Sequence, residues 1–115
     1  MRVVNATRGS TVAARAEVAH GPVRRGLGLM GRRGWIEDDG LVLEGCNSIH
    51  TFFMRMPIDV AYVAKDGRIV RSADAMRPWR IGPIVFKSKW VLELPAGALT
   101  ASGTQPGDRL EVLPD

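Results

Sequence analysis

The spacing of apolar and polar residues along the chain is typical of several short β-strands. Alternation of apolar and polar side chains predicts a strand at 11–19 that pairs with a strand at 2–6. Asp66-Gly67 is typical of a tight two-residue turn, so the apolar segments on either side of it are expected to form a hairpin. The predicted strands after residue 19 are 41–43, 49–55, 58–65, 68–73, 90–94 and 110–113.

One short helix is predicted at about 22–31, where apolar residues recur with helical spacing after Pro22. The strands near Phe52 and Val60 have apolar residues on both faces, so both faces should be covered by other parts of the chain. These patterns predict a mostly β (α+β) fold: a small curled sheet or barrel-like fold of about seven strands, closed by the helix.

Length and composition are those of an ordinary globular domain. The chain has 115 residues, of which 45% are hydrophobic and 24% charged. We therefore expect residues 1–115 to form a single compact domain with one core. Cys46 is the only cysteine, which excludes an internal disulfide and fits a reducing compartment. The first eight residues lack the apolar stretch of a signal peptide and no segment suits a membrane span, so we expect a cytoplasmic protein.

Charge is distributed unevenly along the chain, although the net value is only +4. Residues 1–34 carry seven arginines against Glu17, residues 35–66 are acidic, and residues 67–115 are weakly basic. Cations and aromatic residues interleave between 77 and 90, as they do in single-stranded nucleic-acid sites. Because no nucleic-acid-binding motif accompanies them, we expect neither a nucleic acid nor a membrane as partner.

Cys46 and His50 are the pair of residues most capable of chemistry. A nucleophilic cysteine needs a base, and His50 is the nearest one along the chain. In an extended strand the two side chains would share a face but lie about 13 Å apart, so direct contact requires a bend. A zinc site needs about four ligands, which the sequence does not supply nearby. We expect no metal and no other cofactor.

The segment from Cys46 to Val60, CNSIHTFFMRMPIDV, resembles the prokaryotic family known as domain of unknown function 192. Further matches are Arg25-Gly26-Leu27 leading to Met30, and the stretch LELPAG at 92–97. The resemblance covers about residues 10–113 and implies a compact, mostly β fold. It implies no reaction and no cofactor, and some similar proteins look exported.

A small non-enzymatic binding domain is the leading functional hypothesis. Polar side chains among apolar neighbours suit a ligand site, and an arginine at the rim would suit a small anionic ligand or a protein partner. Asp59, among apolar residues, is expected to be buried and hydrogen-bonded or paired with an arginine. The alternative is an enzyme that uses Cys46 and His50. The candidate ligand-binding residues are Arg25, Cys46, Ser48, His50, Thr51, Met54 and Asp59.

Overall fold

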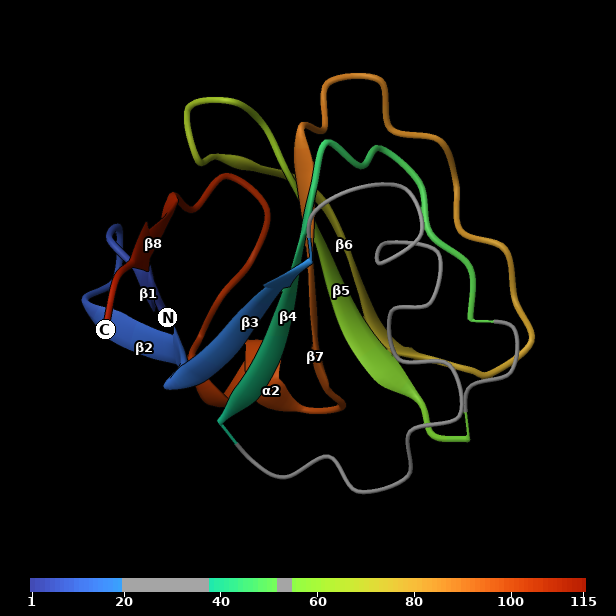
Figure 1. Cartoon of the computed structure of the whole chain (residues 1–115), viewed down its shortest axis with the longest axis horizontal. Helices are drawn as coiled ribbons and strands as arrows, with labels where there is room; N and C mark the ends of the chain where they lie inside the picture. The colour runs from blue at the N-terminus through green and yellow to red at the C-terminus, as the bar shows by residue number, and fades with distance from the viewer. Residues whose placement is uncertain (20–37, 52–54) are drawn as a thin grey trace.

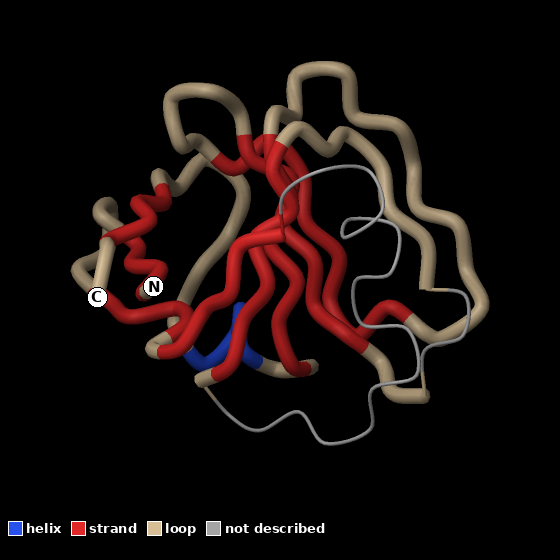
Figure 2. Tube along the Cα trace, viewed as in Figure 1, coloured by secondary structure: helices blue, strands red, loops and turns tan. Residues whose placement is uncertain are grey.

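In a computed structural model of the chain, residues 1–19, 38–51 and 55–115 are described. Within these residues, eight strands form two β-sheets that pack against each other (Figures 1 and 2). The described residues also contain one short helix. The mostly β prediction is therefore confirmed. The sheets are not closed into a barrel, because the two sheets are separate and each keeps edge strands.

The smaller sheet has three antiparallel strands in the order β2-β1-β8. Its strands are β1 (Arg2–Asn5), β2 (Ser10–Ala13) and β8 (Leu110–Leu113), so the two ends of the chain pair with each other. Figure 1 shows this sheet beside both termini, at the left of the molecule. The C-terminal strand lies at the residues that the sequence predicts.

The larger sheet has five strands in the order β3-β4-β7-β5-β6. Only β3 and β4 are parallel; the other neighbours are antiparallel. Because β7 lies between β4 and β5, it is the central strand, with a neighbour on each side. The strands are β3 (Arg15–Ala19), β4 (Asp39–Glu44), β5 (Ile58–Val63), β6 (Ile69–Met76) and β7 (Trp90–Pro95).

The single strand predicted at 11–19 is in fact two strands that belong to different sheets. The chain leaves the smaller sheet after Ala13 and enters the larger one at Arg15. Ala13 and Ala16 both face the core between the sheets, so the apolar pattern continues across the corner. No proline or glycine marks this corner, which explains why the sequence pattern did not reveal it.

The hairpin predicted around Asp66-Gly67 is confirmed, with β5 and β6 as its strands. Gly67 has a φ of +91°, in the left-handed region, and its amide donates to the carbonyl of Ala64 at 2.9 Å. A Cβ at this position would lie 2.5 Å from the carbonyl oxygen of Leu110, so only glycine fits. β6 continues to Met76, three residues beyond the predicted end.

Buried side chains form two apolar clusters, one on each face of the larger sheet. The inner cluster lies between the two sheets, and the outer cluster covers the opposite face of the larger sheet. Every residue of β5 is buried, which confirms that the strand around Val60 is covered on both faces. The largest outer-cluster residues are Leu41, Leu43, Ile49, Ile58 and Tyr62.

One predicted element lies outside the described residues, and another is wrong in part. The helix at 22–31 falls within residues 20–37, outside the described residues. A strand at 49–55 is wrong for residues 49–51, where His50 forms only an isolated bridge with Ile81; residues 52–54 lie outside the described part. The facing loop contains Pro78 and Pro83, which have no N–H to extend a ladder. No described helix is long and apolar enough to cross a membrane.

Candidate functional site

Residues 46–51 and 77–89 run side by side and together form what we call the arm (Figure 1). Main-chain hydrogen bonds hold the two segments together, although neither is a regular strand. The bonds are Thr51 N to Arg80 O at 2.8 Å, Trp79 N to Thr51 O at 2.9 Å, Gly82 N to Ile49 O at 2.8 Å and Val85 N to Asn47 O at 2.7 Å.

Thr51, predicted as a ligand contact, is the structural centre of the arm. Its side chain is fully buried, and its hydroxyl donates to the carbonyl of Arg77 at 2.6 Å. The same oxygen accepts from the amide of Arg80 at 2.8 Å. The hydroxyl therefore shapes the loop that begins at residue 77.

The arm is also fixed to the sheet beneath it. A Cβ at Gly82 would lie 2.6 Å from the hydroxyl oxygen of Tyr62, so glycine permits a close approach of the loop to this buried side chain. At the other end, Ser88 donates its hydroxyl to the carbonyl oxygens of Cys46 at 3.1 Å and Trp90 at 3.0 Å. These contacts leave the arm with a defined position on the outer-cluster side.

Cys46, Ser48 and His50 all belong to the arm, and each is half-buried. The Cys46 side chain packs against the outer cluster, which is the environment of a small apolar residue. His50 lies beside the exposed Ile81 through their backbone bridge. With Thr51, the structure therefore places four of the predicted residues on one element. Arg25 and Met54 lie outside the described residues.

Asp59 is buried, but no arginine of the described residues pairs with it. Its Oδ1 accepts from the amide of Ala75 at 2.8 Å, and its Oδ2 accepts from the amides of Gly97 at 3.1 Å and Leu99 at 3.0 Å. It thereby holds the start of helix α2 (Ala98–Ala101) against the end of β6 at Ala75. Three backbone N–H groups satisfy the carboxylate, so this residue is structural rather than part of the candidate site.

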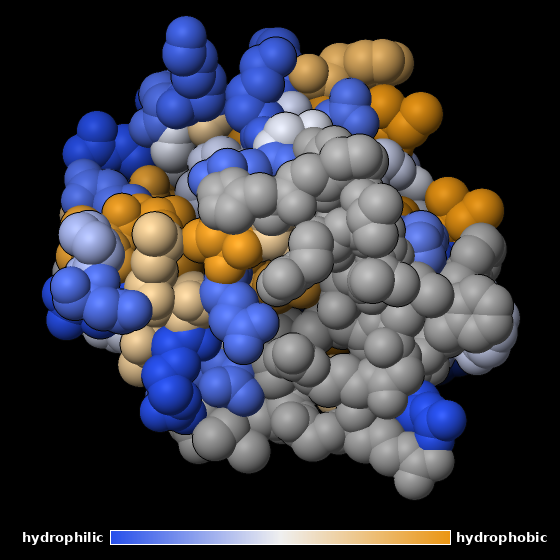
Figure 3. Space-filling model, viewed as in Figure 1, coloured by the Kyte–Doolittle hydropathy of each residue, from blue (hydrophilic) through white to orange (hydrophobic). Residues whose placement is uncertain are grey.

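The outer part of the arm exposes large apolar side chains, which are normally buried. Phe86 is 83% exposed, Ile81 72%, Ile84 61% and Trp79 55%. Four exposed cations lie among them: Arg77, Arg80, Lys87 and Lys89. Figure 3 shows apolar and hydrophilic atoms mixed along the rim where this loop runs. Several exposed large apolar side chains on one loop make it a candidate interaction surface.

Glu93 is a buried carboxyl that the sequence analysis missed. It lies in the centre of β7, opposite Leu41 and Val60, and its Oε2 is the one buried side-chain polar atom of the described residues without a hydrogen-bond partner. Burial raises the pKa of this carboxyl to about 8. Burial, opposed by Arg71 and reinforced by Glu93, also raises the pKa of Tyr62. The signal available in the sequence was the position of this charged residue inside the apolar run 90–94.

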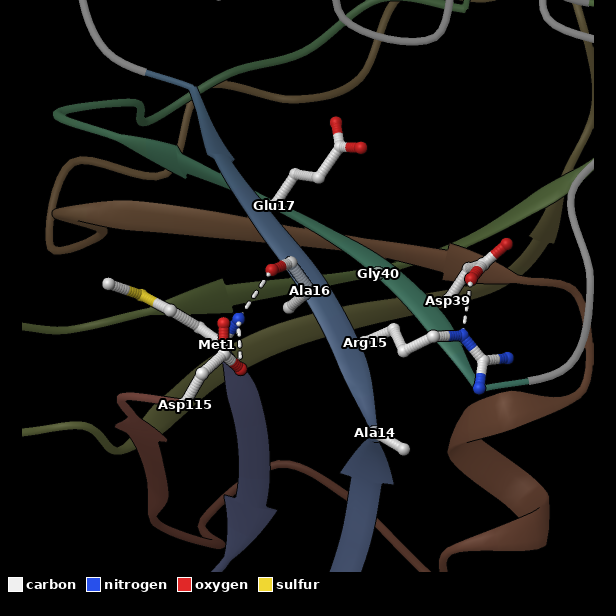
Figure 4. A pocket seen from close by; sticks show the side chains of 8 residues that line it. All are labelled: Met1, Ala14, Arg15, Ala16, Glu17, Asp39, Gly40 and Asp115. Atoms are coloured by element: carbon white, nitrogen blue, oxygen red, sulfur yellow. Dashed lines mark hydrogen bonds and ion pairs between the residues drawn. The ribbon is translucent and has the colours of Figure 1, made fainter.

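A separate hollow of about 350 Å³ lies where β3 and β4 meet the two termini (Figure 4). Its charged groups mostly pair with each other. The Met1 ammonium lies 3.0 Å from the Asp115 carboxylate, and Arg15 lies 3.4 Å from Asp39. None of the predicted site residues that the structure describes lines this hollow. Within the described ranges, no three His, Cys, Asp or Glu residues are grouped as a metal site requires.

Fold and surface define a small two-sheet β domain with an exposed basic and apolar arm. The model of domain of unknown function 192, a family described as uncharacterized, matches residues 3–112. The chain belongs to this family, as the central motif indicated.

Similarity to other proteins covers nearly the whole chain. A UPF0127 protein of Pyrococcus furiosus is 31% identical over 95% of this chain and 96% of its own. A crystal structure from Sinorhizobium meliloti, described as that of a proposed transcription regulator, is 30% identical with a TM-score of 0.77, covering 96% of this chain and 89% of that one. A protein of unknown function from Novosphingobium aromaticivorans has the same fold, with 23% identity, a TM-score of 0.84 and coverage of 97% and 84%.

Proposed function

We propose that this protein is a non-enzymatic binding domain and that the arm is the surface with which it binds an anionic partner. The observation that carries the proposal is the charge of the segment 75–92. It contains Arg77, Arg80, Lys87 and Lys89 and no acidic residue. All four cations are exposed, and none forms an ion pair with a described carboxylate. Such a surface attracts anions over several ångströms.

The internal hydrogen bonds of the arm support a binding role. Ordering a mobile loop on binding costs free energy that a fixed loop does not have to supply. Here Thr51, Gly82 and Ser88 fix the backbone before any partner arrives. Ser48, which is half-buried in the same element, can add a hydrogen bond to an anionic group.

The alternative, an enzyme based on Cys46 and His50, has weaker support. A reactive thiol is expected in polar, electropositive and accessible surroundings, whereas Cys46 packs against the outer cluster. Alkylation with iodoacetamide tests this directly. We expect native Cys46 to react much more slowly than the same thiol in the unfolded chain. Equal rates, with loss of the reaction in His50→Ala, would favour the enzyme.

Binding of anionic probes tests the proposed function. The probes are inorganic phosphate, a polyglutamate peptide, an oligothymidylate and phosphatidylcholine vesicles that contain phosphatidylglycerol. The oligothymidylate covers the nucleic-acid role suggested by the description of the Sinorhizobium protein. The arm variant is Lys87→Gln with Lys89→Gln. The control, Arg2→Gln with Arg68→Gln, removes the same charge from exposed positions outside the arm.

We expect at least one probe to bind the native protein and the control but to bind the arm variant much more weakly. If no probe binds, or if both double variants lose affinity equally, the arm is not the recognition surface. Measurements at low and high salt concentration should show weaker binding at high salt, because the attraction between exposed charges is screened.

A further inference from the structure

The described residues form no enclosed pocket around the four exposed apolar side chains of the arm. Small ligands bind in concave sites that enclose most of their surface. Phe86, Ile81, Ile84 and Trp79 each have more than half of their surface in solvent. A hollow does lie beside Phe86, but it is shallow and open. The shape therefore argues against a small molecule.

In the same hollow, three lysines attract a small anion and one carboxylate opposes it. Lys65, Lys87 and Lys89 line it, and so does Asp66, whose carboxylate would oppose a negative ligand at short range. The carboxylate already accepts from the amide of Arg68 at 3.0 Å, which keeps it at the base of the turn. A broad anionic surface in contact with the outer part of the arm avoids this opposition.

The backbone conformation of Trp79 has an energetic cost. Its φ of +63° lies in the left-handed region, which costs a non-glycine residue on the order of 1–2 kcal/mol. The hydrogen bond from its amide to the carbonyl of Thr51 maintains this backbone. Strain of this kind is concentrated at functional sites, where the surrounding structure holds a side chain in a required place.

Protruding apolar side chains flanked by cations are the chemistry that an anionic lipid surface accepts. Tryptophan and phenylalanine partition into the region between headgroups and acyl chains, and lysine and arginine attract the headgroups. A bilayer needs no preformed pocket on either side, because lipids rearrange around each side chain. A neutral or zwitterionic bilayer would accept the apolar side chains but would not attract the cations.

We infer that the arm docks onto an anionic lipid bilayer, with Phe86, Ile84, Ile81 and Trp79 inserted among the lipids and the four cations at the headgroups. This inference rests on the proposed function and names its partner. It departs from the sequence-based expectation of no membrane partner. The exposure of these side chains, and the backbone that presents them, become apparent only in the folded chain.

Co-sedimentation of the full chain with vesicles tests the inference. We expect binding to phosphatidylcholine vesicles that contain phosphatidylglycerol and little binding to pure phosphatidylcholine. Each cation near such a surface contributes about 1 kcal/mol, which is a factor of about 5. Lys87→Gln with Lys89→Gln should therefore bind roughly 30-fold more weakly. The control, Arg2→Gln with Arg68→Gln, should bind like the native protein.

Insertion of the apolar side chains has its own readout. The Trp79 indole should give a blue-shifted fluorescence emission on vesicle binding, because it moves from water into the interface. Trp79→Phe should lose this shift but still sediment, since a second aromatic residue keeps the apolar contact. Phe86→Ser, which changes a side chain outside the core, should keep its stability to urea and bind vesicles less well.

Three results would overturn the inference, and they separate it from the proposed function. Binding to polyglutamate or oligothymidylate without binding to vesicles would exclude the bilayer and leave the arm as an anion-binding surface. Vesicle binding without a change in Trp79 emission would exclude insertion. Failure to bind any anionic probe would overturn both the inference and the proposed function.

Discussion

Replacement of Glu93 by glutamine should change how stability depends on pH. The carboxyl lies in the central strand β7, 2% exposed, and its Oε2 has no hydrogen-bond partner. Burial raises its pKa from 4.5 to about 8 in the folded chain. The folded state therefore holds this proton more tightly than the unfolded state does, and the stability it provides is complete below pH 4.5 and is lost as pH rises toward 8.

The size of the effect follows from the difference between the two pKa values. Each pKa unit of difference between the folded and unfolded states corresponds to about 1.4 kcal/mol of stability. Between pH 4.5 and pH 7 native Glu93 should lose about 3 kcal/mol of stability, and by pH 8 the loss should reach about 4 kcal/mol. Glu93→Gln cannot ionise, so its stability should not contain this loss.

Urea unfolding followed by tryptophan fluorescence, at pH values from 4 to 9, measures the difference between the two proteins. We expect the free energy of unfolding of Glu93→Gln, relative to the native chain, to rise by about 3 kcal/mol between pH 4 and pH 7. Glu111→Gln makes the same chemical change on the exposed edge of β8 and serves as the control. Parallel curves for Glu93→Gln and the native protein would refute the reasoning.

Three further predictions concern residues with defined backbone or side-chain partners. Asp59→Ala leaves three backbone donors without their acceptor, so urea unfolding should show a loss of about 3 kcal/mol; a loss below about 0.5 kcal/mol would contradict this. Trp79→Gly should be about 1 kcal/mol more stable than Trp79→Ala, because only alanine retains the left-handed strain; equal stability would exclude it. A hydrogen bond from Arg8, reinforced by bonds from Asn5 and Gln105, lowers the pKa of Asp108, so the stability advantage of the native chain over Asp108→Asn should be present at pH 7 and be lost as pH falls below 3.8; an advantage unchanged at pH 2 would contradict it.

Local signals predicted much of the fold. Asp66-Gly67 specifies its hairpin through turn geometry alone, and the apolar runs 90–94 and 110–113 are strands at nearly the predicted residues. The corner at Ala14 could not be predicted, because side chains on both sides of it face the same core. Strand order depends on pairing between distant segments, which alternation along one segment does not encode.

The candidate site was only partly predictable, because its residues act through distant partners. The burial of Asp59 follows from its apolar neighbours, whereas its acceptor role depends on the amides of Gly97 and Leu99, about forty residues away. Glu93 fits an exposed position in an alternating strand, but β7 is covered on both faces. The exposure of Phe86 follows from how the arm pairs, not from its own apolar character.

Amide chemical shifts of the labelled full chain, recorded during titration with bicelles that contain phosphatidylglycerol, test the central role of the arm most directly. If the arm is the recognition surface, shifts and line broadening should be concentrated at Trp79, Ile81 and Phe86. The amides of β8 (Leu110–Leu113), in the smaller sheet, should be unaffected. Changes spread evenly over both sheets, or confined to the hollow beside Met1, would contradict the assignment of the arm.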